Sequence, residues 1–390
     1  MLNVLCLVHH YLPGFKAGGA LRSVSNIATL MAGKCDFRIL TSDRDLGDDT
    51  PYPQIPKDKW LSQGAGSVFY ATNSLRSTFS ILRKSTPDVI YLNSFFDPVF
   101  SIFPILVLKL LVRRQGRIIV APRGEFSRGA LEIKRRKKLL FLTFARISGL
   151  YRNLTWHAST ELEAADIRRA VGRLAQDVRV AQDVATTRDH GTNSESIASL
   201  LRSRTPLKLC FVSRISRMKN LDYALSVLRD VVMPIEFNVY GPIEDEAYMT
   251  LCRTRANSMP KHVTVHFHGP LEHAQVARVM AQHHLFFFPT LGENFGHVIA
   301  ESLSAGTPVL LSDRTPWLNL QEHGVGWSIP LSQPESFGAA LRSLATMDHA
   351  SYELMRARAA THSLKGDRGK VADEMLAVFF QPSPPSHRQG

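Results

Sequence analysis

The chain has 390 residues, of which 44% are hydrophobic and 21% charged; this composition excludes disorder throughout, and the length favours two domains. Four scattered cysteines argue against a disulfide scaffold and indicate a reducing compartment, and the longest apolar run is too short to cross a bilayer. The formal net charge of +13 lies in residues 1–180, because these carry 27 basic and 14 acidic residues whereas residues 181–390 carry 20 of each. We expect no signal peptide.

Short apolar runs alternate with helical patterns along the first half of the chain. The pattern predicts strands over residues 3–8, 37–40, 68–71, 89–92 and 117–121, and helices over residues 20–32, 75–83, 98–112 and 129–148. Such alternation is typical of βαβ units, in which a parallel sheet lies between two layers of helices. We therefore expect a Rossmann-like first domain over residues 1–185.

The same alternation begins again after a polar stretch, residues 186–206, which predicts a linker. Further strands are predicted over residues 207–212, 237–240, 263–267, 285–289 and 308–311, with a first helix over residues 219–230. Residues 207–380 are expected to form a second Rossmann-like domain, and residues 381–390 a disordered tail. The whole pattern predicts an α/β fold of two doubly wound domains whose ligands bind in a cleft between them.

The most informative segment follows a predicted buried strand in the second domain. Glu293 lies in the turn after that strand, and Glu301 lies one to two turns into the next helix. The backbone amides near Asn294, Phe295 and Gly296 would stabilise a phosphate, together with the helix dipole. Because carboxylates accept strong hydrogen bonds from sugar hydroxyls, the segment predicts a site for a phosphorylated sugar. The alternative is a pair of solvated glutamates at a helix end.

A pair of cations follows the first strand of the second domain. Arg214 and Lys219 flank a strand-to-helix turn, from which both can point at a pyrophosphate. They would neutralise the charge that grows on a departing nucleoside diphosphate. The alternative is that both are surface cations, which is the expectation for Arg217 between them.

Two turns in the first domain are further candidates. Gly18 and Gly19 precede a predicted helix, where glycines let the backbone approach a ligand, but they do not fit the G-x-G-x-x-G pattern of a nicotinamide site. Arg123 and Glu125 follow the strand over residues 117–121 and are expected to line the cleft. Arg123 could bind an anionic acceptor or donor group, although its permanent charge prevents it from acting as a general base.

A run of five cations lies in the predicted helix over residues 129–148. It faces either solvent, as most charge runs do, or an anionic membrane, because the apolar residues 139–142 that follow can enter an interface. The run comprises Lys134, Arg135, Arg136, Lys137 and Lys138.

No metal or other cofactor is expected. Asp43 and Asp45 form a D-x-D triplet, but this triplet lacks the context of a metal site. The 15 histidines, including His9 and His10, lack the spacing of zinc ligands.

These segments resemble those of the GT4 family of retaining glycosyltransferases (glycosyl transferases group 1), which have the GT-B fold. The resemblance is strongest over residues 207–330, where P-T-L-G-E-N-F-G contains Glu293 and the later S-A-G-T-P-V follows Glu301. The two cations lie in a segment similar to the family's G-R-x-x-x-x-K-G element, with Ser213 and Asn220 in place of the glycines. The resemblance implies the GT-B fold for this chain.

The resemblance also implies roles for individual residues. Glu293 would contact the donor sugar and Glu301 the ribose of the nucleotide. Glu293, Arg214 and Lys219 would then form the catalytic set.

In the first domain, the loop with Gly18 and Gly19 would face the donor phosphate and the acceptor. Many family members carry a histidine near the donor sugar at the position of Arg123, so the chain departs from the family pattern there.

The implied activity is transfer of a sugar from a UDP- or GDP-sugar to a saccharide or lipid-linked acceptor bound by the first domain. Departure and attack would occur on the same face of the sugar without an enzymic nucleophile, and domain closure would exclude water. The implied setting is assembly of surface polysaccharide or lipopolysaccharide, in the cytoplasm or at the inner face of a bacterial membrane.

Two other functions would account for part of the sequence. A nucleotide-sugar epimerase can share this architecture, but it needs an acid and a base near the sugar, and the sequence singles out no such pair. A basic protein that binds nucleic acid or a membrane would use the charge of the first half. It would leave the arrangement of the two glutamates and two cations unexplained, and nucleic-acid binding would fall steeply with salt.

Overall fold

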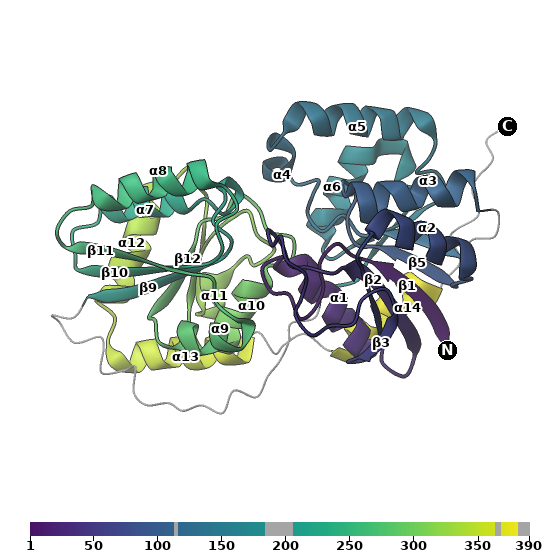
Figure 1. Ribbon diagram of the computed structural model, residues 1–390. Helices are drawn as coiled ribbons and strands as arrows, with labels where there is room; N and C mark the ends of the chain where they lie inside the picture. The colour runs from purple at the N-terminus through teal and green to yellow at the C-terminus, as the bar shows by residue number, and fades with distance from the viewer. Residues whose placement is uncertain (113–115, 184–205, 363–367, 381–390) are drawn as a thin grey trace. The chain divides into compact units, whose positions relative to one another are not determined.

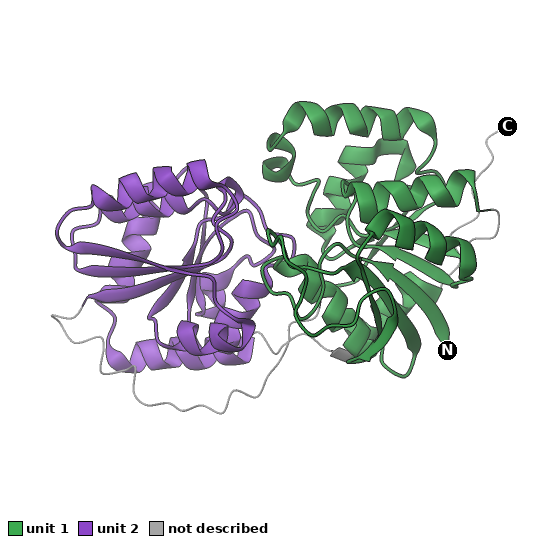
Figure 2. Ribbon diagram, in the orientation of Figure 1, with its two compact units in different colours: residues 1–184, 367–390 green, residues 185–366 purple. Residues whose placement is uncertain are grey.

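The prediction of two Rossmann-like α/β units is confirmed. The computed structural model describes residues 1–112, 116–183, 206–362 and 368–380. Unit 1 comprises residues 1–184 and 367–390, and unit 2 comprises residues 185–366 (Figure 2). Apart from Pro206, the predicted linker lies outside the described residues, as does the predicted tail. Over the described ranges, no helix has the length and apolar character needed to span a membrane.

The sheet of unit 1 has eight strands in the order β3-β4-β2-β1-β5-β6-β7-β8 (Figure 1). Neighbouring strands run parallel, except that β3 and β4 form an antiparallel pair. The strands are β1 (Leu2–Leu7), β2 (Cys35–Ser42), β3 (Trp60–Gln63), β4 (Gly66–Ala71), β5 (Val89–Leu92), β6 (Arg117–Val120), β7 (Thr155–Ala158) and β8 (Asp177–Val180).

Two hydrophobic cores cover the two faces of this sheet, because successive side chains of a strand point to opposite sides. In β1, Val4 and Cys6 join one core and Leu5 and Leu7 join the other. Helices α1 (Gly19–Leu30) and α14 (Arg368–Phe380) cover the first core. Helices α2 (Ser74–Lys84), α3 (Phe103–Leu110), α5 (Arg135–Ser148) and α6 (Glu161–Val171) cover the second.

Helix α14 corrects the predicted domain boundary. The sequence placed residues up to 380 in the second domain, but α14 packs in unit 1. The ring of Phe379 lies 5.9 Å from that of Phe37 in β2 and 5.7 Å from that of Tyr91 in β5. Arg179 of β8 donates a hydrogen bond to the carbonyl of Ala377 at 2.7 Å. A helical pattern shows which face is apolar but not which sheet that face will cover.

The predicted helix over residues 129–148 is broken in two. Helix α4 (Arg128–Glu132) ends before Lys134, whose φ of 55° is left-handed, and α5 begins at the next residue. Lysine rarely adopts this conformation, so the sequence carries no glycine signal for the break. Residues 98–112 likewise form a short π-helical turn, η1 (Pro98–Ile102), followed by α3.

Unit 2 is a six-stranded sheet, parallel throughout, in the order β11-β10-β9-β12-β13-β14. Its strands are β9 (Leu207–Val212), β10 (Ile235–Tyr240), β11 (Val263–Gly269), β12 (Leu285–Phe288), β13 (Val309–Ser312) and β14 (Gly326–Ile329). Its helices are α7 (Leu221–Arg229), α8 (Glu246–Asn257), α9 (His273–Ala281), α10 (His297–Ser304), α11 (Leu320–His323), α12 (Pro334–Ala345) and α13 (His349–His362).

Each sheet has one point at which the strand order reverses. In unit 1 the chain extends the sheet from β1 to β2 on one side and to β5 on the other, and in unit 2 from β9 to β10 and to β12. The loops after the two strands at such a point diverge to opposite faces and leave room for a ligand at the carboxyl edge. A ligand site is therefore expected in the loops after β1 and β5 or after β9 and β12.

Candidate functional site

The loops after β9 and β12 are joined at the strand-order reversal of unit 2. The amide of Leu291 donates to the carbonyl of Met218 at 2.9 Å, and the hydroxyl of Thr290 donates to the same carbonyl at 3.0 Å. The side chain of Asn220 donates to the carbonyl of Pro289 at 2.9 Å. These bonds bring the two charged segments that the sequence singled out into one site.

Lys219 and Glu293 form an ion pair across these loops, and only 13% and 12% of their side chains are exposed. Lys219 ends the short helical turn η4 (Arg217–Lys219), and the left-handed Asn220, with φ of 59°, turns the chain into α7. The ammonium of Lys219 also lies 5.6 Å from the centre of the Phe288 ring. The cation is thus held at the edge of the sheet, facing the loop that precedes α10.

Arg214 lies on the same loop but bonds in another direction. Its Nη1 lies 2.9 Å from Oε2 of Glu244, and about a third of its side chain is exposed. Arg217 is more exposed and pairs with Asp245 at 3.3 Å, as a surface residue would. Arg214 therefore pairs with an exposed glutamate, whereas Lys219 pairs with Glu293, a carboxylate of the candidate site.

The N-terminus of α10 follows Glu293 directly. Its cap residue, Gly296, has a left-handed φ of 79°, and a Cβ at this position would lie 2.7 Å from Cδ1 of Ile299. The carbonyl of Phe295 accepts a 2.6 Å hydrogen bond from the indole of Trp317. The Oδ1 atom of Asn294 is buried and has no hydrogen-bond partner among the described residues. The amide end of α10 is thus fixed by packing, while an acceptor beside it is unsatisfied.

Glu301 lies on the fifth residue of α10, with 20% of its side chain exposed. Its Oε1 lies 3.5 Å from Nδ1 of His273, the first residue of α9. The structure thus joins Lys219 and Glu293 in the loops after β9 and β12 and places Glu301 in the helix that follows β12. The sequence did not identify His273 as a neighbour of Glu301.

Arg123 occupies a different position from the one expected. Its side chain is only 6% exposed, and each of its three guanidinium nitrogens donates to a protein oxygen. Nη1 donates to Oδ1 of Asp183 at 2.8 Å, Nε to Oδ1 of Asn93 at 2.8 Å, and Nη2 to the hydroxyl of Tyr91 at 2.6 Å. Burial by itself lowers the pKa of Arg123, but Asp183 and other nearby groups raise it overall, so the guanidinium stays charged.

The partners of Arg123 extend this network through unit 1. The side-chain amide of Asn93 donates to the carbonyl of Ala20. Ala20 lies in the first turn of α1, directly after Gly18 and Gly19. The hydroxyl of Tyr91 lies 2.7 Å from Nδ1 of His157, whose Nε2 lies 2.9 Å from a carbonyl oxygen. Because a carbonyl only accepts, Nε2 carries the proton and Nδ1 accepts from Tyr91. This geometry gives Arg123 a structural role and disfavours anion binding by its guanidinium.

Both carboxylate oxygens of Glu125 accept hydrogen bonds from nearby protein groups. It accepts from the hydroxyl of Ser94 at 2.7 Å and from the amides of Phe95 at 2.6 Å and Phe96 at 3.1 Å. Burial raises the pKa of Glu125 above its usual value, although these bonds oppose that shift. The carboxylate thus fixes the backbone after β5 and has no oxygen left without a protein donor.

Asp43 and Asp45 have protein partners as well. Asp43 pairs with Arg44 at 2.9 Å, and Oδ2 of Asp45 accepts from the amides of Phe15 at 2.7 Å and Lys16 at 3.1 Å. Asp45 therefore holds the loop that leads to Gly18 and Gly19. Within the described ranges, no cluster of three or more His, Cys, Asp or Glu residues has the geometry of a metal site.

The five cations of the predicted helix differ in their exposure and contacts. Lys134 precedes α5, and the ammonium of Lys138 donates to the carbonyl of Ala130 at 2.7 Å and lies 5.1 Å from the Phe96 ring. Arg135, Arg136 and Lys137 are exposed on the first turn of α5. Further along α5, Leu140, Phe144 and Ile147 are 73%, 51% and 77% exposed, at the spacing of one helix face.

Comparison with known proteins gives a family match within unit 2. Residues 193–362, nearly all of unit 2, match the model of the family described as Glycosyl transferases group 1. Unit 2 is therefore similar to a glycosyl transferases group 1 domain. The Lys219–Glu293 pair and the N-terminus of α10 lie within the matched residues.

Similar proteins are known for longer parts of the chain. A D-inositol 3-phosphate glycosyltransferase of Jonesia denitrificans is 28% identical over 231 residues, which are 57% of this chain and 54% of that protein. The match thus spans about half the length of the relative. The structure of Anabaena HepE in complex with UDP-glucose covers 96% of this chain and 98% of its own, with a TM-score of 0.67 and 16% identity.

WaaG, a glycosyltransferase involved in lipopolysaccharide biosynthesis, covers 97% of this chain and 100% of its own, with a TM-score of 0.66 and 15% identity. The similarity to these two structures establishes that this chain has the GT-B fold.

Proposed function

We propose that the chain is a retaining glycosyltransferase that uses a nucleotide diphosphate sugar, UDP- or GDP-linked. The observation that carries this proposal is the joining of two loops at the strand-order reversal of unit 2. There, a largely buried Lys219–Glu293 pair lies beside the N-terminus of α10. A cation and unpaired helix amides are suited to a diphosphate, and a carboxylate is suited to sugar hydroxyls.

In this proposal, Lys219 and Arg214 stabilise the charge that develops on the leaving diphosphate. Lys219 is paired with Glu293 and Arg214 with Glu244, so both cations are held near the edge of the sheet before a nucleotide binds. A diphosphate would share Lys219 with Glu293, while Glu293 accepts hydrogen bonds from the sugar. Glu301, on α10, accepts from the ribose hydroxyls.

The proposed chemical step uses no enzymic nucleophile. The bond from the anomeric carbon to the diphosphate oxygen breaks, and its electron pair leaves with the nucleoside diphosphate. The acceptor oxygen then forms its bond on the same face of the sugar, which retains the anomeric configuration. As it does so, the acceptor's O–H bond breaks and the proton passes to the departing diphosphate oxygen. The backbone amides of Asn294, Phe295 and Gly296 contact the donor's phosphate or sugar.

We further propose that unit 1 binds the acceptor, a saccharide or a lipid-linked saccharide, during assembly of a surface polysaccharide or lipopolysaccharide. The net charge of +13 over residues 1–180 and the exposed basic and apolar residues of α5 support docking to an anionic membrane. The protein would then work in the cytoplasm at the inner face of the membrane.

Isothermal titration of UDP and GDP tests the proposal, with Glu301→Ala compared to Glu322→Ala, an exposed glutamate on α11. Hydrogen bonds to charged groups contribute about 1.5–3 kcal/mol, so Glu301→Ala should weaken binding on the order of 10- to 100-fold. Glu322→Ala should bind as the wild type does. If neither nucleotide binds the wild type, the proposal fails.

The products then separate the remaining functions. Incubation with UDP-glucose, UDP-N-acetylglucosamine and GDP-mannose, followed by proton NMR, should show release of the nucleoside diphosphate and a sugar of unchanged anomeric configuration. An inverted product would contradict retention, and a changed ring configuration with the nucleotide still attached would identify an epimerase. Nucleic-acid binding that survives Glu301→Ala and falls steeply with salt would favour a binding protein.

A further inference from the structure

Unit 1 contains a cavity of about 440 Å³ at the carboxyl edge of its sheet, in the loops after β1, β2 and β4. Its volume lies within the range of about 300–1,000 Å³ that is typical of small-molecule sites. The residues that line it all lie between positions 9 and 74. The cavity is therefore a feature of unit 1 alone.

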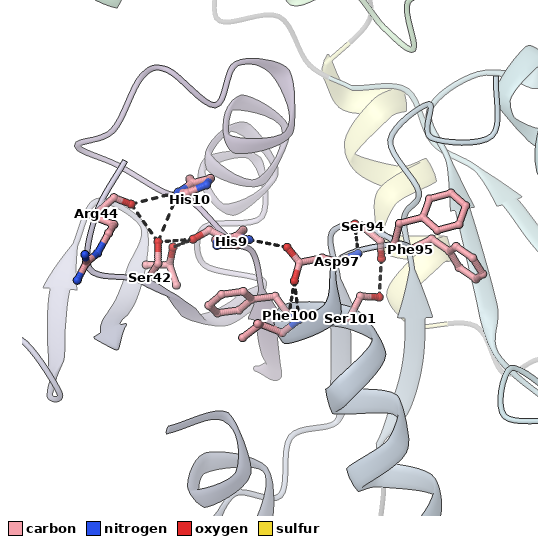
Figure 3. Close-up of polar contacts among 12 residues, drawn as sticks. His9, His10, Ser42, Arg44, Ser94, Phe95, Asp97, Phe100 and Ser101 are labelled. Atoms are coloured by element: carbon pink, nitrogen blue, oxygen red, sulfur yellow. Dashed lines mark hydrogen bonds and ion pairs between the residues drawn. The ribbon is translucent and has the colours of Figure 1, made fainter. Parts of the chain in front are cut away.

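Hydrogen bonds between the loops after β1 and β2 hold one wall of the cavity in place (Figure 3). The hydroxyl of Ser42 donates to the carbonyl of His9 at 2.7 Å. Nδ1 of His10 lies 3.1 Å from the carbonyl of Arg44. The rings of His9 and His10 stack with their centroids 4.3 Å apart, and Nδ1 of His9 lies 2.6 Å from Oδ2 of Asp97. This wall is formed before any ligand binds, which lowers the entropic cost of binding.

Asp43 presents an unsatisfied carboxylate oxygen to the cavity. Only 4% of its side chain is exposed, and its Oδ1 accepts from Nε of Arg44 at 2.9 Å. Its Oδ2 accepts from no group among the described residues, and it is not one of the atoms that are sealed from solvent. Since Asp43 lines the cavity, the open side of Oδ2 is the cavity itself. A carboxylate that is so nearly enclosed is suited to a strong hydrogen bond from a hydroxyl group that enters the cavity.

Arg44 supplies a hydrogen-bond donor beside this oxygen. Its Nε is bonded to Asp43, and its Nη1 donates to the carbonyl of Asp49 at 2.6 Å. Its Nη2 donates to no acceptor in the part of the chain that the structure describes, and 38% of the side chain is exposed. Because a hydroxyl group both donates and accepts, neighbouring hydroxyls of a sugar ring can donate to Asp43 and accept from Arg44. The two residues are thus suited to a polyhydroxylated ligand.

The charge of the lining favours an uncharged ligand over a phosphorylated one. Three carboxylates and one guanidinium line the cavity, namely Asp43, Asp45, Asp48 and Arg44. The remaining titratable groups of the lining are His9, which pairs with Asp97, and His10. Burial lowers the pKa of His10, so its imidazole adds no positive charge near pH 7. Even with Lys16, which pairs with Asp48 from outside the lining, the carboxylates outnumber the permanent cations, and a phosphate would be repelled.

We propose that this cavity binds an uncharged saccharide, with Asp43 and Arg44 bonded to neighbouring hydroxyl groups of one sugar ring. The saccharide is the acceptor of the proposed function, on which the inference rests, and its binding uses unit 1 alone. Because Asp43 accepts and Arg44 donates, the two residues select among sugars by the positions of their hydroxyls. Binding changes no covalent bond, and it can be measured in the absence of any nucleotide.

The test is binding of uncharged methyl glycosides to the full chain without nucleotide, measured by saturation-transfer difference NMR. The panel has the gluco, galacto, manno and N-acetylgluco configurations, and the 6-phosphate of each sugar is its charged counterpart. We expect at least one glycoside to bind and its 6-phosphate to bind more weakly. Asp43→Asn removes the charged acceptor and Arg44→Met removes the donor, and each should weaken binding at least about 10-fold. Glu161→Gln, at an exposed position of α6, is the matched control and should bind as the wild type does.

The outcomes separate this inference from the proposed function. The inference is wrong if no glycoside of the panel binds, if a 6-phosphate binds more tightly than its uncharged counterpart, or if either folded variant binds as the wild type does. A chain that binds a glycoside through Asp43 but binds neither UDP nor GDP contradicts the proposed function and leaves the saccharide site in place. Thermal unfolding shows whether lost binding comes from lost structure. Arg44→Met alters a side chain that is more than a third exposed, so it should stay folded even if Asp43→Asn does not.

Discussion

Lys219 and Glu293, which lie 74 residues apart in the chain, form an ion pair of which little more than a tenth of either side chain is exposed. The pair exists because β9 and β12 are neighbours in the sheet, so the loops after them share one edge. It couples a residue assigned to the diphosphate to one assigned to the sugar.

Replacing one partner should separate binding from transfer. Glu293→Gln removes the carboxylate but leaves Lys219 available to a diphosphate, so we expect UDP affinity equal to or above that of the wild type. Turnover of the donor should fall at least about 100-fold, because the sugar loses a charge-assisted hydrogen bond in the transition state. Titration and turnover measure the two effects. Wild-type turnover in Glu293→Gln would contradict the assigned role.

Gly296 and Gly33 offer a matched pair of substitutions, since both have φ of 79°. An alanine at Gly33 meets nothing within 4 Å, whereas one at Gly296 lies 2.7 Å from Ile299. Gly33→Ala should cost only the left-handed strain, about 1–2 kcal/mol. Gly296→Ala should cost about 1–3 kcal/mol more in the free energy of unfolding and weaken UDP binding, because the start of α10 must move. Equal losses in the two variants would show that α10 adapts.

Arg123 is expected to act on stability rather than on anion binding. Arg123→Met removes the Arg123 cation from the buried ion pair with Asp183, and breaking a buried pair in this way costs about 3–5 kcal/mol. Arg136→Met, at an exposed position of α5, should change the free energy of unfolding by no more than about 0.5 kcal/mol.

The double variant Arg123→Met, Asp183→Asn should recover part of that loss, because the buried negative charge is removed together with the cation. A stable Arg123→Met protein that binds donor or acceptor poorly would instead restore the role in ligand binding.

Acid should destabilise unit 1 through His157. Burial lowers the pKa of this imidazole to about 4, from the usual 6.5. Between these values the unfolded chain binds a proton that the folded chain does not, so stability falls as the pH drops from 6.5 to 4, by up to about 3 kcal/mol. Denaturant unfolding at pH 7 and 4.5 measures the loss. His157→Gln should reduce it, whereas the exposed His349→Gln should not.

Membrane docking should depend on the exposed apolar face of α5. Burying a leucine or isoleucine contributes about 1.5–3 kcal/mol, so Leu140→Ser with Ile147→Ser should weaken binding to vesicles at least 10-fold. Vesicles with 30% phosphatidylglycerol should bind the wild type more tightly than neutral ones, and less so at high salt. Val232→Ser removes an apolar residue that is 91% exposed in unit 2 and should change nothing. Equal binding by both variants would exclude α5.

The parts of the molecule that could be predicted from the sequence are those that local patterns determine. A buried strand, a glycine-containing turn and a helix start predict that Glu293 lies in the turn after the strand and Glu301 in the helix. A similar strand and turn predict the positions of Arg214 and Lys219 after β9. That Lys219 rather than Arg214 meets Glu293 depends on the conformation of the loop, which the sequence does not show.

Features set by distant contacts were missed or mistaken. A single arginine after a strand looks the same whether it binds a substrate or, as Arg123 does, a buried aspartate 60 residues later. The side chains of His9 and Asp97, in the loops after β1 and β5, lie 2.6 Å apart. This contact has no motif spacing, but it follows from the strand order, because β1 and β5 are neighbouring parallel strands. The left-handed Lys134 that divides the basic helix has no residue-type signal at all.

Because α14 packs in unit 1, the two units cannot be separated by cutting the chain at a single position. A fragment ending near residue 183 would expose the side of the first sheet against which Met375, Val378 and Phe379 pack, and should aggregate. Supplying residues 368–380 through a short linker after β8, or as a separate peptide, should restore a monomeric fragment suited to crystallisation with acceptors.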